Sequence, residues 1–284
     1  WSRGLKVRLK VGVENFSGNF VEVTRGAGPV VLGMPHTGTH VPAEIFARLN
    51  DEGRSLRDAD WHIDRLYDGL LAGATIVRAK FHRYVIDANR DPSGASLYPG
   101  RNTTGLVPLT NFDGAALWTT PPDAEETERR RLACHAVYHA ALHAELARVK
   151  ALHGVAILYD CHSIRSHIPH LFDGVLPDLN IGTNDGATCD AAVEAMVADA
   201  ARRSSFSHVV NGRFKGGWTT RHYGKPAQGV HAVQMELAQS LYLTSEAPPF
   251  SYDEVRAEKL RSALSEILKG LAALAPLLAE KARA

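Results

Sequence analysis

The stretch GVAILYDCHS, residues 154–163, decides how the rest of the chain is interpreted. Its first six residues are mostly apolar and include the β-branched Val155 and Ile157, which is typical of a strand buried on both faces of a sheet. The run ends abruptly in polar residues, among them Asp160 and His162. A buried strand with polar residues at its carboxyl end indicates an α/β fold with a ligand site at the sheet edge.

Further segments of both kinds surround this strand. Apolar, strand-like runs occur at residues 29–34, 74–78, 83–87, 207–210 and 230–235. Helical periodicity occurs at residues 60–71, 122–153 (with room for one break), 191–203 and 252–284. Irregular glycine-containing loops occupy residues 89–122 and 212–229. This alternation predicts an α/β protein with three α/β/α layers and a mostly parallel, mixed sheet, forming a single domain over residues 1–284.

Composition restricts the partners. The chain has 284 residues, and its 32 Lys and Arg against 31 Asp and Glu leave a net charge of +1. That balance predicts no nucleic-acid partner and no membrane partner. We expect a cytoplasmic protein, because three scattered cysteines do not suit a disulfide framework and neither a signal-peptide core nor an apolar run of about 20 residues is present. The oligomeric state stays open.

Four of the expected strands are followed by residues that carry chemistry. His36, Asn89, His162 and Glu236 each come just after such a strand, and Arg90 follows Asn89 directly. The carboxyl ends of parallel strands meet at one edge of a sheet, so we expect these side chains to converge.

A metal site is the first interpretation of this convergence. Catalytic zinc takes three protein ligands and keeps one position for water, and we expect His36 and His162 to be two of the three. Asp60 and Asp64 both qualify as the third ligand because they lie four residues apart on an expected helix. We favour Asp64, next to the apolar face of that helix. The expected cofactor is one divalent ion, Zn²⁺ by preference, although such ligands also accept Co²⁺, Mn²⁺ or Fe²⁺.

Glu236 is the expected general base. It follows the apolar run at 230–235, and burial there would raise the pKa of its carboxyl group towards a useful value. A charged residue that merely ends a strand is the alternative. His135, His139 and His143 also recur every four residues, but charged neighbours indicate a solvated helix, so we do not assign them to the catalytic site.

Arginine is concentrated in the two irregular loops. Guanidinium groups bind carboxylates through two parallel hydrogen bonds, which predicts a small anionic substrate. Arg83 and Arg90 are the candidates for stabilising a tetrahedral oxyanion. Surface solubility is the alternative role for these arginines, and Arg165 could add to the group. The expected substrate-binding residues are Asn89, Arg90, Arg101, Arg213, Thr220 and Arg221.

Taken together, these segments resemble the N-formylglutamate amidohydrolase (deformylase) family of histidine degradation. The similarity runs from about residue 35 to 243 and includes PHTGTHVP (35–42), DWHIDRLYDGL (60–70), RYVIDANRDPSGASLYPGRNTTGLVP (83–108), DCHSIRSHIPHLFDG (160–174), LPDLNIGTNDG (176–186), NGRFKGGWTTRHYGKP (211–226) and VQMELAQSLYL (233–243).

The resemblance implies a fold and an activity. It implies the phosphorylase/hydrolase-like α/β/α fold of the related zinc carboxypeptidases, and metal-dependent hydrolysis of N-formyl-L-glutamate to formate and L-glutamate. By position, His36 and His162 match ligands, Asn89–Arg90 the carboxylate clamp and Glu236 the base. The carboxypeptidase pattern His-x-x-Glu has Thr39 in place of the glutamate, so the carboxylate ligand must come from elsewhere. Alternatives are deacylation of another N-acylated acidic amino acid, or a non-catalytic metal- or ligand-binding protein on the same scaffold.

Overall fold

The computed structural model describes residues 19–96 and 103–282. A seven-stranded sheet lies at its centre, with strand order β1-β3-β2-β4-β7-β5-β6. The strands are β1 (Val21–Thr24), β2 (Val30–Met34), β3 (Thr75–Ala79), β4 (Ala156–Ile164), β5 (Leu179–Gly182), β6 (His208–Val210) and β7 (Val230–Ala238).

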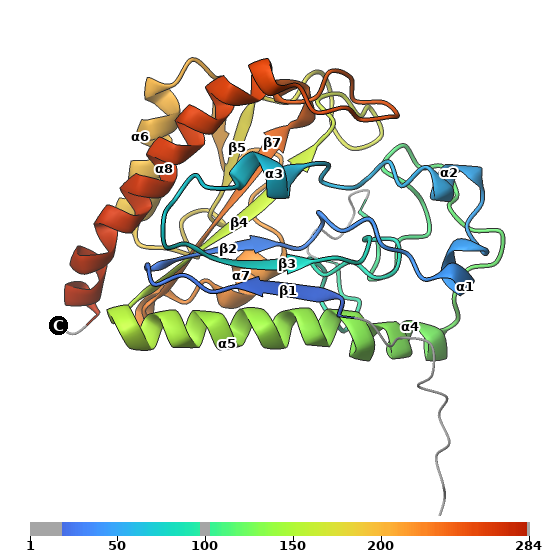
Figure 1. The fold of residues 1–284 in the computed structure, drawn as a ribbon, viewed down its shortest axis with the longest axis horizontal. Coiled ribbons are helices and arrows are strands. Elements are labelled where there is room, and N and C mark those ends of the chain that lie inside the picture. The colour runs from blue at the N-terminus through green and yellow to red at the C-terminus, as the bar shows by residue number, and fades with distance from the viewer. Residues whose placement is uncertain (1–18, 97–102, 283–284) are drawn as a thin grey trace, which may run out of the picture.

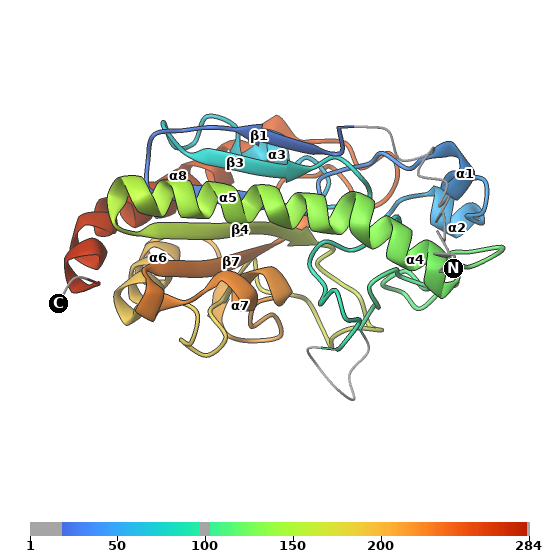
Figure 2. The ribbon, with the colours of Figure 1, turned by 90° about the horizontal axis from the view of Figure 1, so that it is seen from below.

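Helices cover both faces of this sheet (Figure 1). They are α1 (Ala43–Phe46), α2 (Asp51–Arg54), α3 (Ile63–Tyr67), α4 (Ala124–Arg130), α5 (Ala136–His153), α6 (Ala191–Arg203), α7 (Trp218–Tyr223) and α8 (Glu254–Lys281), with a π-helical turn at Arg131–His135 and 3₁₀ turns at Pro226–Gln228 and Gln239–Leu241. Helices α5 and α7 lie on one face, where Figure 2 shows them in front of the strands, and α3, α6 and α8 lie on the other.

The strand directions make the sheet mixed. Neighbouring pairs among β3, β2, β4 and β7 are parallel, whereas β1 runs antiparallel to β3 and β5 antiparallel to β7. The predicted α/β class with a mostly parallel, mixed sheet is therefore confirmed. The short strands β1 and β5 and the helix α7 were not among the expected elements, since each is too short for a clear periodicity.

Strand β4 is the centre of the core. All nine of its residues are buried. Ile157 and Tyr159 pack towards α8, while Leu158 packs towards α5, because successive side chains in a strand point to opposite faces. A strand covered on both faces needs apolar residues at nearly every position, which explains the continuous run in the sequence.

The register between β4 and β7 positions the candidate site. His162 on β4 lies directly opposite Glu236 on β7, and both strands continue two residues further. These residues are therefore inside their strands rather than just beyond them. Parallel pairing at this register brings the two side chains to the same edge of the sheet from positions 74 residues apart in the chain, which is 236 minus 162.

Two local expectations were wrong. Residues 83–87 form a turn rather than a strand, because Tyr84, Val85 and Ile86 are all buried in the core beside α5 instead of pairing with a neighbouring strand. The helix expected at 60–71 is only α3, since His62 adopts a left-handed conformation with φ of 59° and interrupts it.

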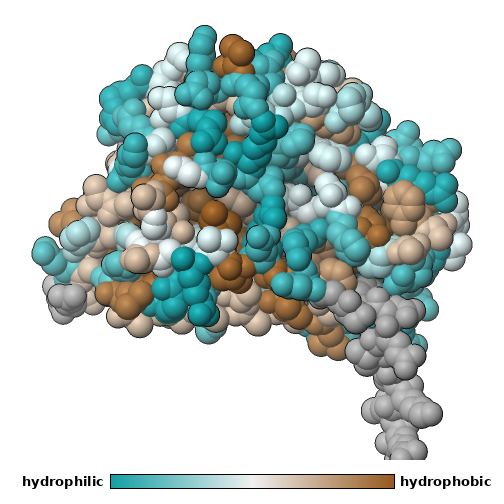
Figure 3. Space-filling model, in the orientation of Figure 1, coloured by the Kyte–Doolittle hydropathy of each residue, from teal (hydrophilic) through white to brown (hydrophobic). Residues whose placement is uncertain are grey.

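Helix α8 completes the layer opposite α5. Among the described residues it is the one helix long and apolar enough to cross a membrane by length and composition. Its leucines Leu260, Leu264 and Leu268 are buried against the sheet and α6, as in a helix that completes a protein core. The molecular face in Figure 3 is a mosaic of hydrophilic and apolar residues.

Candidate active site

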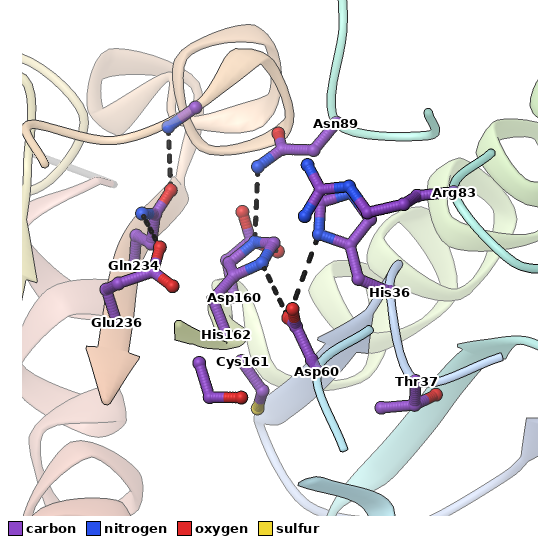
Figure 4. A network of polar contacts seen from close by, with 12 residues as sticks. His36, Thr37, Asp60, Arg83, Asn89, Asp160, Cys161, His162, Gln234 and Glu236 are labelled. Carbon is purple, nitrogen blue, oxygen red and sulfur yellow. Dashed lines mark hydrogen bonds and ion pairs between the residues drawn. The ribbon is translucent and has the colours of Figure 1, made fainter. Parts of the chain in front are cut away.

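Three buried side chains meet at the carboxyl edge of the sheet. Oδ2 of Asp60 lies 3.1 Å from Nδ1 of His162 and 3.7 Å from Nδ1 of His36 (Figure 4). His36 follows β2 by two residues, and its carbonyl accepts a hydrogen bond from the backbone N–H of Asp60 at 3.0 Å, which fixes the approach of the two segments. All three side chains are at most 2 % exposed.

This group fits a divalent metal ion. Two ligand atoms about 2.1 Å from a tetrahedral ion lie about 3.4 Å apart, which is close to the spacing found around Asp60. In addition, Nδ1 of His36 is buried and has no hydrogen-bond partner among the described residues. A buried polar atom without such a partner is rare in proteins, and a bound cation would satisfy it. His36, Asp60 and His162 also form a group with suitably spaced ligand atoms.

A carboxylate lies behind each of the two histidines, close to its Nε2 atom. Oδ1 of Asp87 lies 2.7 Å from Nε2 of His36, and Oδ1 of Asp160 lies 3.2 Å from Nε2 of His162. In metal sites a carboxylate in this position holds the ring and its tautomer so that the other nitrogen faces the ion, as Asp87 does for His36. Here that nitrogen is Nδ1 in both rings. Nε2 of His162 also lies 3.2 Å from Nδ2 of Asn89, whose Oδ1 accepts from the backbone N–H of Thr219. Neither aspartate was expected from the sequence; the signal available was Asp160 two residues before His162.

Opposite charges keep the buried carboxyl groups of Asp87 and Asp60 ionised. Burial alone would raise the pKa of Asp87, but Arg83 and then Arg90 and His36 hold it well below its usual range. Burial would likewise raise the pKa of Asp60, which its contacts with His162 and His36 instead lower. The site therefore offers anionic oxygens to a cation.

The structure does not bring Asp64 to the two histidines, contrary to the expectation that Asp64 rather than Asp60 is the third ligand. The carboxylate of Asp64 forms an ion pair with Arg78 and is 37 % exposed, away from the two histidines. The reason is the left-handed His62, which prevents residues 60–71 from forming one continuous helix. Asp60 and Asp64 consequently do not share a helical face.

Glu236 lies beside this group on β7. It is 8 % exposed, and burial raises its pKa above the ordinary value, against the opposing effect of His162. A carboxyl group with a raised pKa can take a proton near neutral pH and release it again. In Figure 4 its carboxylate faces the side on which His162 and Asp60 lie.

A cavity of about 270 Å³ opens over these residues, close to the lower end of small-molecule sites. Its lining includes His36, Asp60, His162 and Glu236, together with apolar side chains from several parts of the chain. The larger apolar residues in this lining are Leu106, Phe112, Ile164, Leu171 and Phe214. The space suits a small ligand that is partly apolar and carries charged groups.

Three of the expected arginines and Asn89 line this cavity. Arg83 is buried, pairs with Asp87 at 2.6 Å and stacks over the ring of Phe112. Arg90 contacts the backbone and hydroxyl oxygens of Thr104 at 2.9 and 2.8 Å. Arg213 reaches the cavity from the second loop. Positive charge is therefore supplied from two segments, residues 83–90 and the loop that contains Arg213.

Other expected substrate contacts lie elsewhere. Thr220 is fully buried, and its hydroxyl donates to Oδ2 of Asp160 at 2.8 Å, so it supports the residue behind His162. Arg221 donates to the carbonyl of Gly216, and Arg165 pairs with Asp113. None of these three is among the described residues that line the cavity. Arg101 lies outside the described residues.

His135 of the π-helical turn and His139 of α5 hold the backbone beside the site. Nε2 of His135 contacts the carbonyl of Arg90 at 3.0 Å, and Nε2 of His139 contacts the carbonyl of Ala88 at 2.8 Å. His143 is exposed. The structure thus gives two of the three a role in holding the segment that contains Asn89.

Gly217, at the start of α7, lies so close to the side chain of Asn89 that there is no room for a Cβ atom. A Cβ atom there would lie 2.3 Å from Nδ2 of Asn89, whose amide sits 3.2 Å from Nε2 of His162. We expect Gly217→Ala to displace Asn89 and to lower kcat/KM roughly 10–100-fold, as disturbed outer contacts of metal sites do. Steady-state kinetics measure this. In an Asn89→Ala background the same substitution should cost nothing more; an equal loss there would contradict the steric explanation.

The fold and the site define a class of protein. An α/β/α sheet whose carboxyl edge carries a buried His–Asp–His group, a neighbouring glutamate and an arginine-lined cavity is the architecture of a hydrolase for small anionic substrates.

Comparison with known proteins identifies the family. The chain belongs to the N-formylglutamate amidohydrolase family, whose model matches residues 28–243. It is 49 % identical over 253 residues to an N-formylglutamate deformylase of Pseudomonas aeruginosa and 46 % identical to one of Pseudomonas putida, in each case covering 88 % of this chain and 94 % of the relative.

Solved structures agree with this assignment. An N-formylglutamate amidohydrolase from Ralstonia eutropha has a TM-score of 0.70 and 25 % identity, over 93 % of this chain and 98 % of that one. A gene product of Agrobacterium tumefaciens shares the fold with a TM-score of 0.70 at 19 % identity, over 90 % of this chain and 96 % of that one. The chain is accordingly an amidohydrolase of this family that acts on a small molecule.

Proposed function

We propose that the protein hydrolyses N-formyl-L-glutamate to formate and L-glutamate, as a step of histidine degradation, with one divalent metal ion, Zn²⁺ by preference. The observation that carries the proposal is the arrangement of His36, Asp60 and His162 within reach of one ion, with Glu236 beside them. The names of the two Pseudomonas relatives support the substrate. A cytoplasmic location is consistent with three unpaired, buried cysteines.

His36, Asp60 and His162 would hold the ion. A divalent metal at such a site polarises a carbonyl group and lowers the pKa of water. Glu236 takes a proton from the attacking water and returns it to the amide nitrogen as the bond to the formyl carbon breaks. The carboxylic acid proton of the formyl product then passes to the amine, so the products are formate and a protonated amino group, and atoms and charges balance.

The arginines of the cavity are assigned two roles, stabilisation of the oxyanion and binding of the substrate carboxylates. Arg83 lies beside His36 in Figure 4, and we assign it to the oxyanion that develops on the formyl oxygen. Its Nε is buried without a hydrogen-bond partner among the described residues, so it retains a donor for a ligand. Arg90 and Arg213, which line the same cavity, are assigned to the two carboxylates of the substrate.

Removing the metal is the direct test. Purified protein is expected to contain about one metal equivalent per chain by elemental analysis, to lose formate release when the ion is chelated, and to recover it when Zn²⁺ is added back. Full activity in protein shown by elemental analysis to be metal-free would refute the metal-dependent mechanism.

The size of the acyl group tests the substrate. In a cavity of about 270 Å³ we expect N-formyl-L-glutamate to be hydrolysed with a higher kcat/KM than N-acetyl- or N-succinyl-L-glutamate. Release of glutamate, measured with each compound, compares them directly. A preference for either larger acyl group would replace the proposed substrate but leave the metal mechanism intact.

A further inference from the structure

Gln234 connects the proposed base to the loop that begins α7. It lies two residues before Glu236 on β7, so both side chains point to the same face of the sheet. Nε2 of Gln234 donates to Oε2 of Glu236 at 3.2 Å, and Oε1 accepts from the backbone N–H of Gly217 at 2.7 Å (Figure 4). The side chain is 3 % exposed and lines the cavity.

The orientation of this amide follows from its neighbours. A backbone N–H is only ever a donor, so the atom of Gln234 that faces Gly217 must be its carbonyl oxygen. The NH₂ group of Gln234 therefore faces Glu236. An NH₂ group is only a donor, so the oxygen of Glu236 that it contacts must act as an acceptor.

The two oxygens of Glu236 are thereby made unequal. Oε2 is occupied as the acceptor of the Gln234 hydrogen bond. The other oxygen points to the side on which His162 and Asp60 lie (Figure 4). A proton taken by the carboxylate is best placed on that second oxygen, where it faces the reacting groups.

The geometry points to Gln234 as a positioning residue for catalysis: it holds one oxygen of Glu236 as an acceptor and so directs the transferred proton to the oxygen that faces the metal group. This inference rests on the proposed role of Glu236 as the base. Gln234 does not itself exchange a proton with the substrate. The side chain of Gln234 is itself held by the backbone N–H of Gly217, and that of Asn89 by the N–H of Thr219. The start of α7 therefore supports both Asn89 and the proposed base.

A structural brace is the competing role. Gln234 could serve only to anchor the Gly217 loop, in which case any acceptor of similar size would do. Gln234→Glu separates the two roles, because a glutamate still accepts from the N–H of Gly217 but presents a carboxylate instead of an NH₂ group to Glu236. Positioning requires the amide; bracing does not.

The test compares the variants Gln234→Ala, Gln234→Glu and the exposed control Gln228→Ala in the metal-loaded protein. We expect both Gln234 variants to lower kcat for formate release roughly 10–100-fold, with KM and metal content near the wild-type values. The control should match wild type. Unfolding temperatures identify a variant that is merely unstable. Wild-type kcat in Gln234→Glu would refute positioning and leave the brace.

A double substitution tests whether Gln234 acts through Glu236. In a Glu236→Gln background, Gln234→Ala should cause no further loss of kcat, since the group that it positions is absent. A further 10-fold loss would refute the inference. If Glu236→Gln alone keeps wild-type kcat, the proposed base has failed instead, and the two failures are thereby distinguished.

Discussion

Glu236→Gln is expected to lower kcat for formate release by roughly 10²–10⁴-fold, the range that general acid–base groups contribute. The amide has nearly the shape of the carboxylate but cannot accept the proton of the attacking water. Glu236 is not one of the three proposed metal ligands, which are His36, Asp60 and His162. The metal content should therefore stay near the wild-type value. Stopped assays of formate and elemental analysis of the same sample measure both quantities.

A matched control accompanies this substitution. Glu258 lies on α8 and is exposed, so Glu258→Gln makes the same chemical change away from the site and should leave kcat unaltered. Undiminished kcat in Glu236→Gln would remove this residue as the base. Loss of the metal in that variant would show that Glu236 is a ligand instead.

Asp60→Asn is expected to release the metal and to reduce kcat/KM by at least about 10²-fold, because even residues behind metal ligands cost 10–100-fold when changed. Asp60 is the member of the group that contacts both histidines. An asparagine is neutral, so it offers the ion a weaker oxygen and leaves two imidazoles without their shared anion. Metal titration by calorimetry gives the affinity, and kinetics give the activity.

The neighbouring aspartate provides the control for this prediction. Asp64→Asn removes an equal charge four residues away, where the carboxylate pairs with Arg78 at the surface. Surface ion pairs contribute only about 0–1 kcal/mol, so metal affinity and kcat/KM should remain close to wild type. If Asp64→Asn lost the metal and Asp60→Asn kept it, the geometry of the site described above would be refuted.

Polar residues at strand ends were predictable because the apolar runs before them were unambiguous. His36, His162 and Glu236 each follow such a run, and a parallel sheet brings its carboxyl ends to one edge whatever the intervening loops do. Residues in the loops were harder to place. Thr220 and Arg213 belong to one segment that the sequence predicts as a loop, yet Thr220 lies on α7 and supports Asp160 while Arg213 reaches the cavity.

The positions of the aspartates were likewise not predictable from the sequence pattern. Asp60 and Asp64 look equivalent on an ideal helix, and only the left-handed turn at His62 separates them. Asp87 was hidden in a segment that resembled a strand, but that segment is a turn whose apolar residues are buried beside α5. Local periodicity carries no information on such turns, because tertiary packing decides them.

The amino-acid sequence by itself determined the α/β class, the strands that hold His162 and Glu236, and, through its similarity to relatives, the amidohydrolase family. Only the tertiary structure decided that Asp60 joins the two histidines, that Asp87 and Asp160 lie behind them, and that Gln234 holds Glu236. The physical reason is the distance along the chain between the residues that interact. Strand formation depends on neighbouring residues, whereas the contacts of Asp60 and Asp87 with the histidines join positions at least 24 apart (60 minus 36). Asp160 and Gln234 lie only two residues from His162 and Glu236, but their side chains are held by Thr220 and Gly217, which fold against them from another part of the chain.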